Sequence, residues 1–199
     1  MKFKINESNI DSEFTRIAEL LLWEYELVVN NEKFNFTEIE FYYYSKNHQD
    51  AFTHKHKEDA GNWRFHNQGF DITLKGETGF GGILIRGVES KGTFINGPRR
   101  VLFEIMSHLN PVSELNNIIG LEQKKETKSK IFKTFRHGLN NPNAKLPCND
   151  REYFRNANYR FLVNPQSFDK NQFQGSEIIA KRFNNAEMSH EFLGYNLRQ

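Results

Sequence analysis

The chain has 199 residues, a length that suits one well-packed domain and is short for two. Aromatic residues make up 14% of it, so we expect a core built mainly on rings, and its single cysteine, Cys148, excludes an internal disulfide. No apolar run approaches the roughly 20 residues that cross a bilayer, and the first residues lack the apolar core of a signal peptide. We therefore expect a cytoplasmic protein that makes no contact with a membrane.

The formal net charge of +2 is unevenly distributed along the chain. Residues 121–160 include ten basic and four acidic side chains and so carry +6, whereas the rest of the chain carries −4. The basic residues are Lys124, Lys125, Lys128, Lys130, Lys133, Arg136, Lys145, Arg151, Arg155 and Arg160. Such a segment suits a polyanion, and a solvated lysine-rich helix or loop explains the charge equally well.

The first predicted element is an amphipathic helix from residue 8 to about residue 28. Apolar residues recur there at steps of three and four, and Ser8 or Asp11 can cap its start. A strand is predicted over residues 34–44, where aromatic and β-branched side chains dominate. The polar stretch 45–61, which contains several histidines, is predicted to be a loop.

Three further strands are predicted at residues 63–66, 70–74 and 82–89. The glycine-rich residues 76–81 separate the second from the third and predict a hairpin turn between them. The three strands therefore belong to a sheet whose neighbours are mostly antiparallel.

Gly97-Pro98 introduces a predicted helix over residues 99–109, because proline suits the first turn of a helix. Its expected buried stripe consists of Val101, Leu102, Ile105 and Met106. A last strand is predicted at residues 159–163, and the basic segment before it is part helix and part loop. Since no repeat or linker interrupts this order, we predict one α+β domain over residues 1–199, built around a curved, mostly antiparallel sheet with surrounding helices.

Two features are weak indicators of a binding site. His48, His54, His56 and His66 have no dense ligand spacing and no cysteine partner, so we interpret them as surface residues and expect no metal and no cofactor. The glycine-rich residues 76–82 have neither the lysine nor the following helix of a phosphate-binding loop.

A stronger candidate site consists of Glu40, Tyr42, His54, Asp71 and Arg86. Glu40 and Tyr42 share a strand face, because side chains repeat every two residues, and the hairpin brings the strands of Asp71 and Arg86 together. An acid near an arginine and a histidine, among rings, makes a dry pocket with a tunable base. A buried Glu–Arg ion pair with a purely structural role explains the same pattern.

At these residues the chain resembles a divergent member of the alkyladenine (3-methyladenine) DNA glycosylase family. That family has a Val-Glu-Thr-Glu-Ala-Tyr segment, an Asp-x-Ala-x-His segment, an asparagine on a strand, a Val-Leu-Leu-Arg-Ala-Leu-Glu strand, a Gly-Pro helix start, an Arg-x-Gly-Leu segment and an Arg-Phe-Tyr strand. In the same order this chain has Thr37-Glu38-Ile39-Glu40-Phe41-Tyr42, Asp50-Ala51-Phe52-Thr53-His54, Asp71, Ile83-Leu84-Ile85-Arg86-Gly87-Val88-Glu89, Asn96-Gly97-Pro98, Arg136-His137-Gly138-Leu139 and Tyr159-Arg160-Phe161-Leu162-Val163. The resemblance covers roughly residues 36 to 165, and its order is more specific than any one segment.

The resemblance implies a role for each matching residue. Glu40 stands where the family has its water-activating glutamate, and Arg86 where it has the arginine beside that glutamate. Tyr42 and His54 stand at two positions that sandwich the extruded base. The implied fold is the one shared by these glycosylases and the C-terminal domain of formyltransferases.

The chain departs from the family at three points. Where the family has an asparagine that faces the edge of the bound base, this chain has Asp71. The difference bears on which base the protein would prefer. Trp63, Phe65 and His66 are all candidates for a third stacking residue. The sequence has no clear equivalent of the aromatic wedge that fills the gap in the duplex.

The resemblance thus predicts a monofunctional DNA glycosylase of base excision repair. It would hydrolyse the N-glycosidic bond of a flipped-out alkylated or otherwise modified purine and leave an abasic site. We expect a monomer that binds double-stranded DNA containing damaged or modified bases, with phosphates contacted by Arg99, Arg100, Lys130, Lys133 and Arg136. Two alternatives stay open: a non-catalytic nucleic-acid-binding module on the same fold, and an N-glycosidase that acts on a different modified base or nucleoside.

Overall fold

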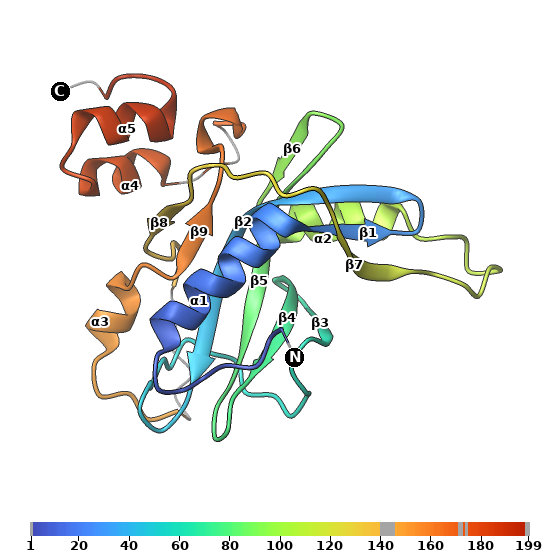
Figure 1. Ribbon diagram of the computed structural model, residues 1–199, viewed down its shortest axis with the longest axis horizontal. Coiled ribbons are helices and arrows are strands. Elements are labelled where there is room, and N and C mark those ends of the chain that lie inside the picture. Colours follow the sequence, from blue (N-terminus) through green and yellow to red (C-terminus); the bar gives the residue numbers. More distant parts are fainter. Residues whose placement is uncertain (1, 140–145, 171–172, 174, 198–199) are drawn as a thin grey trace.

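The computed structural model describes residues 2–139, 146–170, 173 and 175–197. Within these residues nine strands form one antiparallel sheet, which curls into a half-barrel (Figure 1). The strands are β1 (Tyr25–Val29), β2 (Glu32–Tyr44), β3 (Trp63–His66), β4 (Gly69–Lys75), β5 (Phe80–Ser90), β6 (Thr93–Asn96), β7 (Ile119–Gln123), β8 (Phe132–Thr134) and β9 (Arg160–Leu162). Their order across the sheet is β3-β4-β5-β2-β1-β7, with β6 paired to β5, and β9 paired to both β2 and β8.

Strand β2 is the longest strand and the centre of the sheet. It pairs with β5 along one edge, and with β1 and then β9 along the other. Register shifts on either side of Glu38 interrupt its pairing with β5, as a β-bulge does. Residues 37–41 are all buried, so both faces of the sheet are covered at this point. Glu38 and Glu40 are consequently enclosed, with exposed fractions of 2% and 0%.

The predicted strands of the central sheet are confirmed. The strand predicted at residues 63–66 is β3 with the same bounds, and those at 34–44, 70–74 and 82–89 are β2, β4 and β5 with slightly longer bounds. Because β4 and β5 pair antiparallel, residues 76–79 form the expected hairpin turn. The strand predicted near the end of the chain is β9.

Helix α1 (Ile10–Glu19) lies across one face of the sheet (Figure 1). Asn9, rather than Ser8 or Asp11, caps its start, because the Asn9 side chain accepts a hydrogen bond from the backbone N–H of Ser12. Its Phe14 ring stacks on the ring of Phe41 from β2, with ring centroids 4.5 Å apart.

The predicted end of this first helix was wrong. The helix continues as a single π-helical turn, Leu20–Glu24, and the chain then enters β1 at Tyr25. Burial in β1 alternates with period two, and β1 is bonded on both edges, by β2 and β7. Leu27 fits both a helical and a strand repeat, so tertiary pairing decides the structure here.

Helix α2 (Pro98–Ser107) packs against β4 and β5. Val101 and Ile105 are fully buried, as their spacing predicted, but Met106 is 47% exposed, so its place in the buried stripe was wrong. The basic segment contributes β7, β8 and the short helix α3 (Arg151–Asn156). Its Lys145 lies outside the described residues.

The chain ends in a short 3-10 helix, Pro165–Ser167, and two helices, α4 (Ser176–Arg182) and α5 (Ala186–Leu193), that lie beside β8 and β9 (Figure 1). These helices enclose a small second cluster of apolar side chains, which includes Phe132, Leu162 and Phe192. The main core lies between the sheet and the helices α1 and α2. The protein is therefore a single α+β domain. None of the helices in the described part of the chain has the length and apolar composition that a bilayer crossing requires.

Candidate functional site

A cavity of about 350 Å³ opens on the sheet face that points away from α1. This is within the usual range for small-molecule sites. Its ring-bearing residues are Tyr42, Phe52, His54, His56 and His66, and its other walls include Asp71, Leu84 and Leu139. Rings and polar groups thus share the lining, and Asp71 is the acidic residue among those that line it.

Strand register explains why these residues meet. Glu40 of β2 pairs with Leu84 of β5, and Leu84 pairs with Asp71 of β4, so the three lie in one row across the sheet. Tyr42 pairs with Gly82 in the next row. A Cβ on Gly82 would lie 3.1 Å from Asp71 Oδ2, so glycine keeps the cavity floor open beside this carboxylate.

Next to the cavity lies a buried cluster of two carboxylates and two guanidiniums. Arg86 Nε donates to Glu38 Oε1 at 2.7 Å, and Arg160 donates to the same oxygen at 2.8 Å. Arg86 NH1 lies 3.4 Å from Glu40 Oε2, a weaker contact. Burial alone would raise the pKa of Glu38, but the charges of Arg160 and Arg86 outweigh it and hold that pKa below its usual value. The cluster is formally neutral, which makes its burial tolerable.

Tyr42 connects the cavity with this cluster. Its hydroxyl donates to Glu40 Oε2 at 2.7 Å, and its ring lines the cavity. Burial and the nearby Glu40 charge raise the pKa of Tyr42 well above its usual value, so it remains a neutral donor. The guanidinium of Arg136 lies 4.6 Å from the ring centroid, so at most one face of the ring is free for a ligand. Glu40 is fully buried and lies one hydrogen bond behind the cavity.

On another wall Asp71 lies between Arg64 and His66. Its Oδ2 lies 3.2 Å from Arg64 NH1, and its Oδ1 lies 3.2 Å from His66 Nε2. The ring of His54 stands edge-on to the ring of His66, with centroids 5.9 Å apart. Burial and the positive charges of Arg64 and His66 lower the pKa of His54, and Asp71 offsets only part of this. His54 is therefore an uncharged ring near neutral pH.

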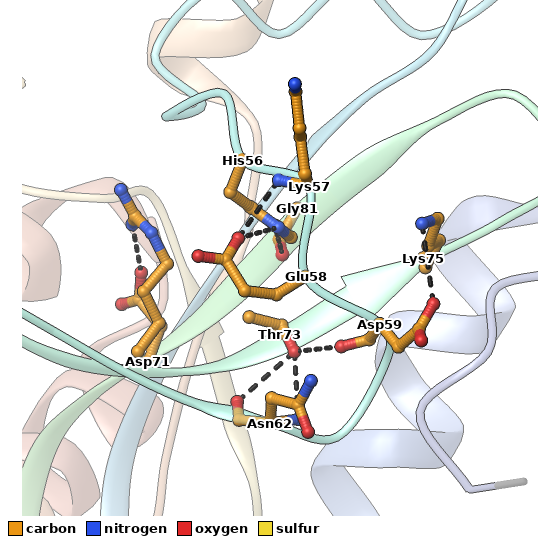
Figure 2. Close-up of polar contacts among 10 residues, drawn as sticks. His56, Lys57, Glu58, Asp59, Asn62, Asp71, Thr73, Lys75 and Gly81 are labelled. Carbon is orange, nitrogen blue, oxygen red and sulfur yellow. Dashed lines mark hydrogen bonds and ion pairs between the residues drawn. The ribbon is translucent and has the colours of Figure 1, made fainter.

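The loop that carries His54 is fastened to the hairpin by its neighbours (Figure 2). His56 Nε2 lies 2.7 Å from the Gly81 carbonyl oxygen, and Nδ1 lies 2.9 Å from Glu58. Thr73 Oγ1 donates to the Asp59 carbonyl oxygen at 2.5 Å. These contacts fix one wall of the cavity to β4 and β5.

Of the four histidines interpreted as surface residues, His48 is buried, and His56 and His66 are half-buried, so that interpretation was wrong for these three. The side chain of His56 is 4% exposed. The ring nitrogens of His48 contact the Tyr43 carbonyl oxygen and the Tyr159 hydroxyl. Within the described part of the chain, no three His, Cys, Asp or Glu side chains are arranged to hold a metal ion.

Of the three candidates for a third stacking residue, His66 lines the cavity and the other two do not. Trp63 packs against Phe70 and donates its indole N–H to the Ile119 carbonyl oxygen at 3.1 Å. Phe65 stacks on the same Phe70. Because side chains alternate along β3, Trp63 and Phe65 share one face while Arg64 and His66 share the other. The assignment of Trp63 to the base pocket was therefore wrong.

Arg136 was also misplaced as a phosphate-binding residue. Its side chain is fully enclosed, and NH1 donates to Asp50 Oδ2 at 2.6 Å and to the Phe41 carbonyl oxygen. NH2 donates to the Phe154 carbonyl oxygen at 2.7 Å. A phosphate in solvent cannot reach this guanidinium.

The other four basic candidates are exposed but lie in two separate places. Arg99 donates to the Asn67 carbonyl oxygen, beside the turn that carries Gln68 of the cavity rim, and Arg100 follows it on α2. Lys130 pairs with Glu191 of α5. Lys133 donates to Thr15 of α1 and lines a different, open groove between α1 and α3.

Several residues that the sequence did not single out belong to the site. Glu38 shares the strand face of Glu40, so the period-two repeat pointed to it. Arg160 arrives from β9, far along the chain, and only the matched Arg-Phe strand hinted at it. Asp71 pairs with Arg64 and His66 rather than with Arg86, which is held by Glu38.

A curled antiparallel sheet, a cavity on one face and a buried carboxylate–guanidinium cluster beside it define the class: a single-domain α+β protein with a candidate ligand cavity. No protein-family model matches the chain, and no curated protein matches it in sequence.

Proposed function

We propose that this protein is a monofunctional DNA glycosylase that removes an alkylated or otherwise modified purine, and that its half-barrel is the fold of the alkyladenine DNA glycosylase family. The observation that carries the proposal is the hydrogen bond from Tyr42, which lines the cavity, to the buried carboxylate Glu40. This arrangement sets a carboxylate one hydrogen bond behind a cavity that could receive a flat base.

In the proposed complex the extruded base lies among the rings of Tyr42, His54 and His66. Stacking contributes about 1–3 kcal/mol per base, and extrusion from the duplex costs a few kcal/mol. A purine alkylated at a ring nitrogen is positively charged, and the rings attract that charge. Asp71 lines the same cavity and is paired there with Arg64.

In the proposed reaction a water molecule attacks the anomeric carbon of the sugar. The N-glycosidic bond breaks, and its electron pair goes to the ring nitrogen of the base. A cationic alkylated purine thereby leaves as a neutral molecule, while Glu40 accepts the proton that the attacking water loses. Positive charge develops on the sugar in the transition state, and the Glu40 carboxylate stabilises it. Arg99 and Arg100 lie on α2 beside the turn that carries Gln68 of the cavity, and the exposed Lys55 and Lys57 flank His56 of its lining, so these basic groups could meet a phosphate.

Two observations support alternative functions. Glu40 is fully enclosed, so the sugar reaches it only if Tyr42 moves, and this favours a non-catalytic base-binding module as the second candidate. Lys130 and Lys133 lie away from the cavity, so the five predicted phosphate-binding residues do not form one track past its mouth. That division favours a nucleoside or another modified base as the substrate over a long duplex.

The decisive experiment is digestion of methylated duplex DNA and identification of the released bases by mass spectrometry. We expect released methylated purines with the wild-type protein and a loss of about 10²–10⁴-fold in rate with Glu40→Gln, since this is the usual contribution of a general base. Release by Glu40→Gln at the wild-type rate would show that Glu40 has another role. Binding of the methylated DNA without any released base would favour the non-catalytic module.

A further inference from the structure

The glycine-rich turn between β4 and β5 (residues 76–79) holds the carboxylate of Glu7, which belongs to the segment before α1. Glu7 Oε1 accepts hydrogen bonds from the backbone N–H of Gly79 at 2.7 Å, the backbone N–H of Thr78 at 3.0 Å and the Tyr43 hydroxyl at 2.8 Å. Glu7 Oε2 accepts from the Thr78 hydroxyl at 2.7 Å. Uncharged donors thus converge on one carboxylate, as they do in the backbone nests that bind anions.

The close approach of these donors depends on two glycines of the turn. A Cβ on Gly79 would lie 2.5 Å from the Tyr43 hydroxyl oxygen, and a Cβ on Gly76 would overlap both that oxygen and the Glu7 side chain. A hydrogen bond from the Gly76 N–H to the Gly79 carbonyl oxygen, at 3.2 Å, closes the turn. The turn is therefore shaped around an anion, although its sequence lacks the lysine of a phosphate-binding loop.

The charges at the turn restrict which anion it binds. Burial would raise the pKa of Glu7, but the hydrogen bonds from Thr78, Tyr43 and the two backbone N–H groups outweigh it and hold that pKa below its usual value. The turn thus favours the charged carboxylate. Glu77 is exposed in the same turn and adds a negative charge of its own. A singly charged carboxylate is consequently repelled less than a doubly charged phosphate.

The hairpin that contains this turn also supports one wall of the cavity. Figure 2 shows the Gly81 carbonyl oxygen against His56, 2.7 Å from Nε2. The Phe80 ring stands edge-on to the His56 ring, with centroids 6.0 Å apart, and His56 lines the cavity. The segment before α1 is bonded to the same hairpin, because the Ile5 N–H donates to the Lys75 carbonyl oxygen at 2.9 Å. The contacts of this segment therefore bear on where His56 lies.

We propose that the turn between β4 and β5 is a carboxylate-binding site whose resident ligand is the chain's own Glu7, and that the occupied site fixes the His56 wall of the cavity. Both statements go beyond the proposed glycosylase function and do not depend on it. Glu7 is a positioning residue, since it acts on the cavity through the hairpin and touches no molecule bound there. When the Glu7 side chain is truncated, a small free carboxylate takes its place.

The binding site is tested by thermal melting of Glu7→Ala at neutral pH, with sodium acetate compared with sodium chloride at equal ionic strength. We expect Glu7→Ala to melt below the wild type, and acetate to raise its Tm by about 2–4 °C more than chloride does, as a ligand of the folded chain would. Two variants should show no such difference: Glu7→Gln, whose amide still occupies the site, and Glu32→Ala, whose carboxylate is held by the exposed Lys91. An equal response of Glu32→Ala, or a larger response of Glu7→Ala to phosphate than to acetate, would overturn the carboxylate site.

The effect on the cavity is tested by NMR spectroscopy of the histidine rings. We expect the His56 ring resonances to shift in Glu7→Ala and to return toward their wild-type positions with acetate. The resonances of His108, which pairs with Glu104 on α2, should not move. Unchanged His56 resonances in a folded Glu7→Ala would overturn the positioning role. Should Glu7→Ala not fold, Glu7→Gln is the second test, and a wild-type Tm with unshifted His56 resonances would then overturn the proposal.

Discussion

Two buried ion-pair regions of this molecule differ in how completely their polar atoms are satisfied. In the first region, Asp50 Oδ2 accepts from Arg136 and Oδ1 accepts from the backbone N–H of Phe52. In the second, Glu40 has one engaged oxygen and one without a partner among the described residues. Among the described residues Arg136 donates three hydrogen bonds and only its Nε lacks a partner, whereas Arg160 contacts Glu38 and has two nitrogens without a partner.

This difference separates a structural ion pair from a candidate reactive one. Arg136 joins the loop after β2 to the carbonyl oxygens of Phe41 and Phe154, so it connects three parts of the chain. The Glu40 cluster holds its carboxylate in place but leaves an acceptor available. A buried acid that is fully hydrogen-bonded stabilises the fold, and one that is only partly hydrogen-bonded has capacity left for a reactant.

The largest effect is expected from Asp50→Ala. The substitution leaves Arg136 buried without its carboxylate, and such a change typically costs about 3–5 kcal/mol. Urea denaturation at neutral pH measures the loss in the free energy of unfolding. Glu40→Gln should cost less, because Arg86 and Arg160 keep Glu38 as a common partner. Equal losses for the two variants would remove the distinction between the regions.

A smaller loss is expected from Tyr42→Phe. Glu40 Oε2 loses its shortest hydrogen bond, and leaving a buried acceptor under-satisfied costs about 1–3 kcal/mol. Thermal melting measures the stability, with Trp63→Phe as a control that removes a donor outside the cavity. In the proposed reaction Tyr42→Phe alters the rate of base release and Trp63→Phe does not. An equal change in that rate with Trp63→Phe would contradict the placement of Trp63 outside the cavity.

Gly82→Ala should act on the cavity with little effect elsewhere. The added Cβ lies 3.1 Å from Asp71 Oδ2, so the Asp71 side chain must rotate away from its present position. A displaced rotamer costs about 0.5–1.5 kcal/mol, which we expect to appear as weaker binding of free methylated purines in calorimetry. Gly92→Ala is the control for steric crowding, because nothing lies within 4 Å of its added Cβ. The positive φ of Gly92 means that this control variant carries backbone strain. Unchanged binding by Gly82→Ala would show that the base does not lie against this floor.

The smallest effect is a pH dependence in the Asp50 region. Burial lowers the pKa of His48, whose ring contacts the Tyr159 hydroxyl, and the charges of Asp50 and Asp11 offset this only in part. The unfolded chain therefore binds a proton more readily than the folded one, and stability is lost as pH falls below about 6.5, the ordinary histidine value. Urea denaturation at pH 7 and pH 5 should show a larger loss for the wild type than for His48→Gln. A loss of the same size in both would assign the pH dependence to other groups.

The sequence predicted the central sheet well because its strands are long and their repeats are clear. Strands β2, β4 and β5, the hairpin between the last two and the start of α2 at Pro98 follow from local patterns. The end of the first helix was missed because Leu27 fits both repeats, and β1 forms through pairing on both edges. No prediction was made for α4 and α5, which pack on a separate small cluster.

The candidate site could be predicted only in part, because tertiary pairing decides which side chains meet. Tyr42, His54, His66 and Asp71 do line one cavity, and Glu40 lies beside it. Alternation along β3 indicates that Trp63 and His66 point to opposite faces, but local sequence does not say which face is the cavity. Arg136 reaches Asp50 across 86 positions of the chain, so its burial follows from tertiary structure alone.

The pairing of β9 with β2 has a consequence for the synthesis of the chain. Residues 38–40 of β2 carry both glutamates, and Arg160 is the residue that pairs with Glu40 in the β9 register. At about 5–20 residues per second, Arg160 leaves the ribosome roughly 6 to 24 seconds after Glu38. During that interval Glu38 lacks one of its two guanidinium partners, so the two carboxylates remain hydrated in the nascent chain. The charged centre is therefore completed only after β9 has been synthesised, and a chain that ends before β9 lacks it.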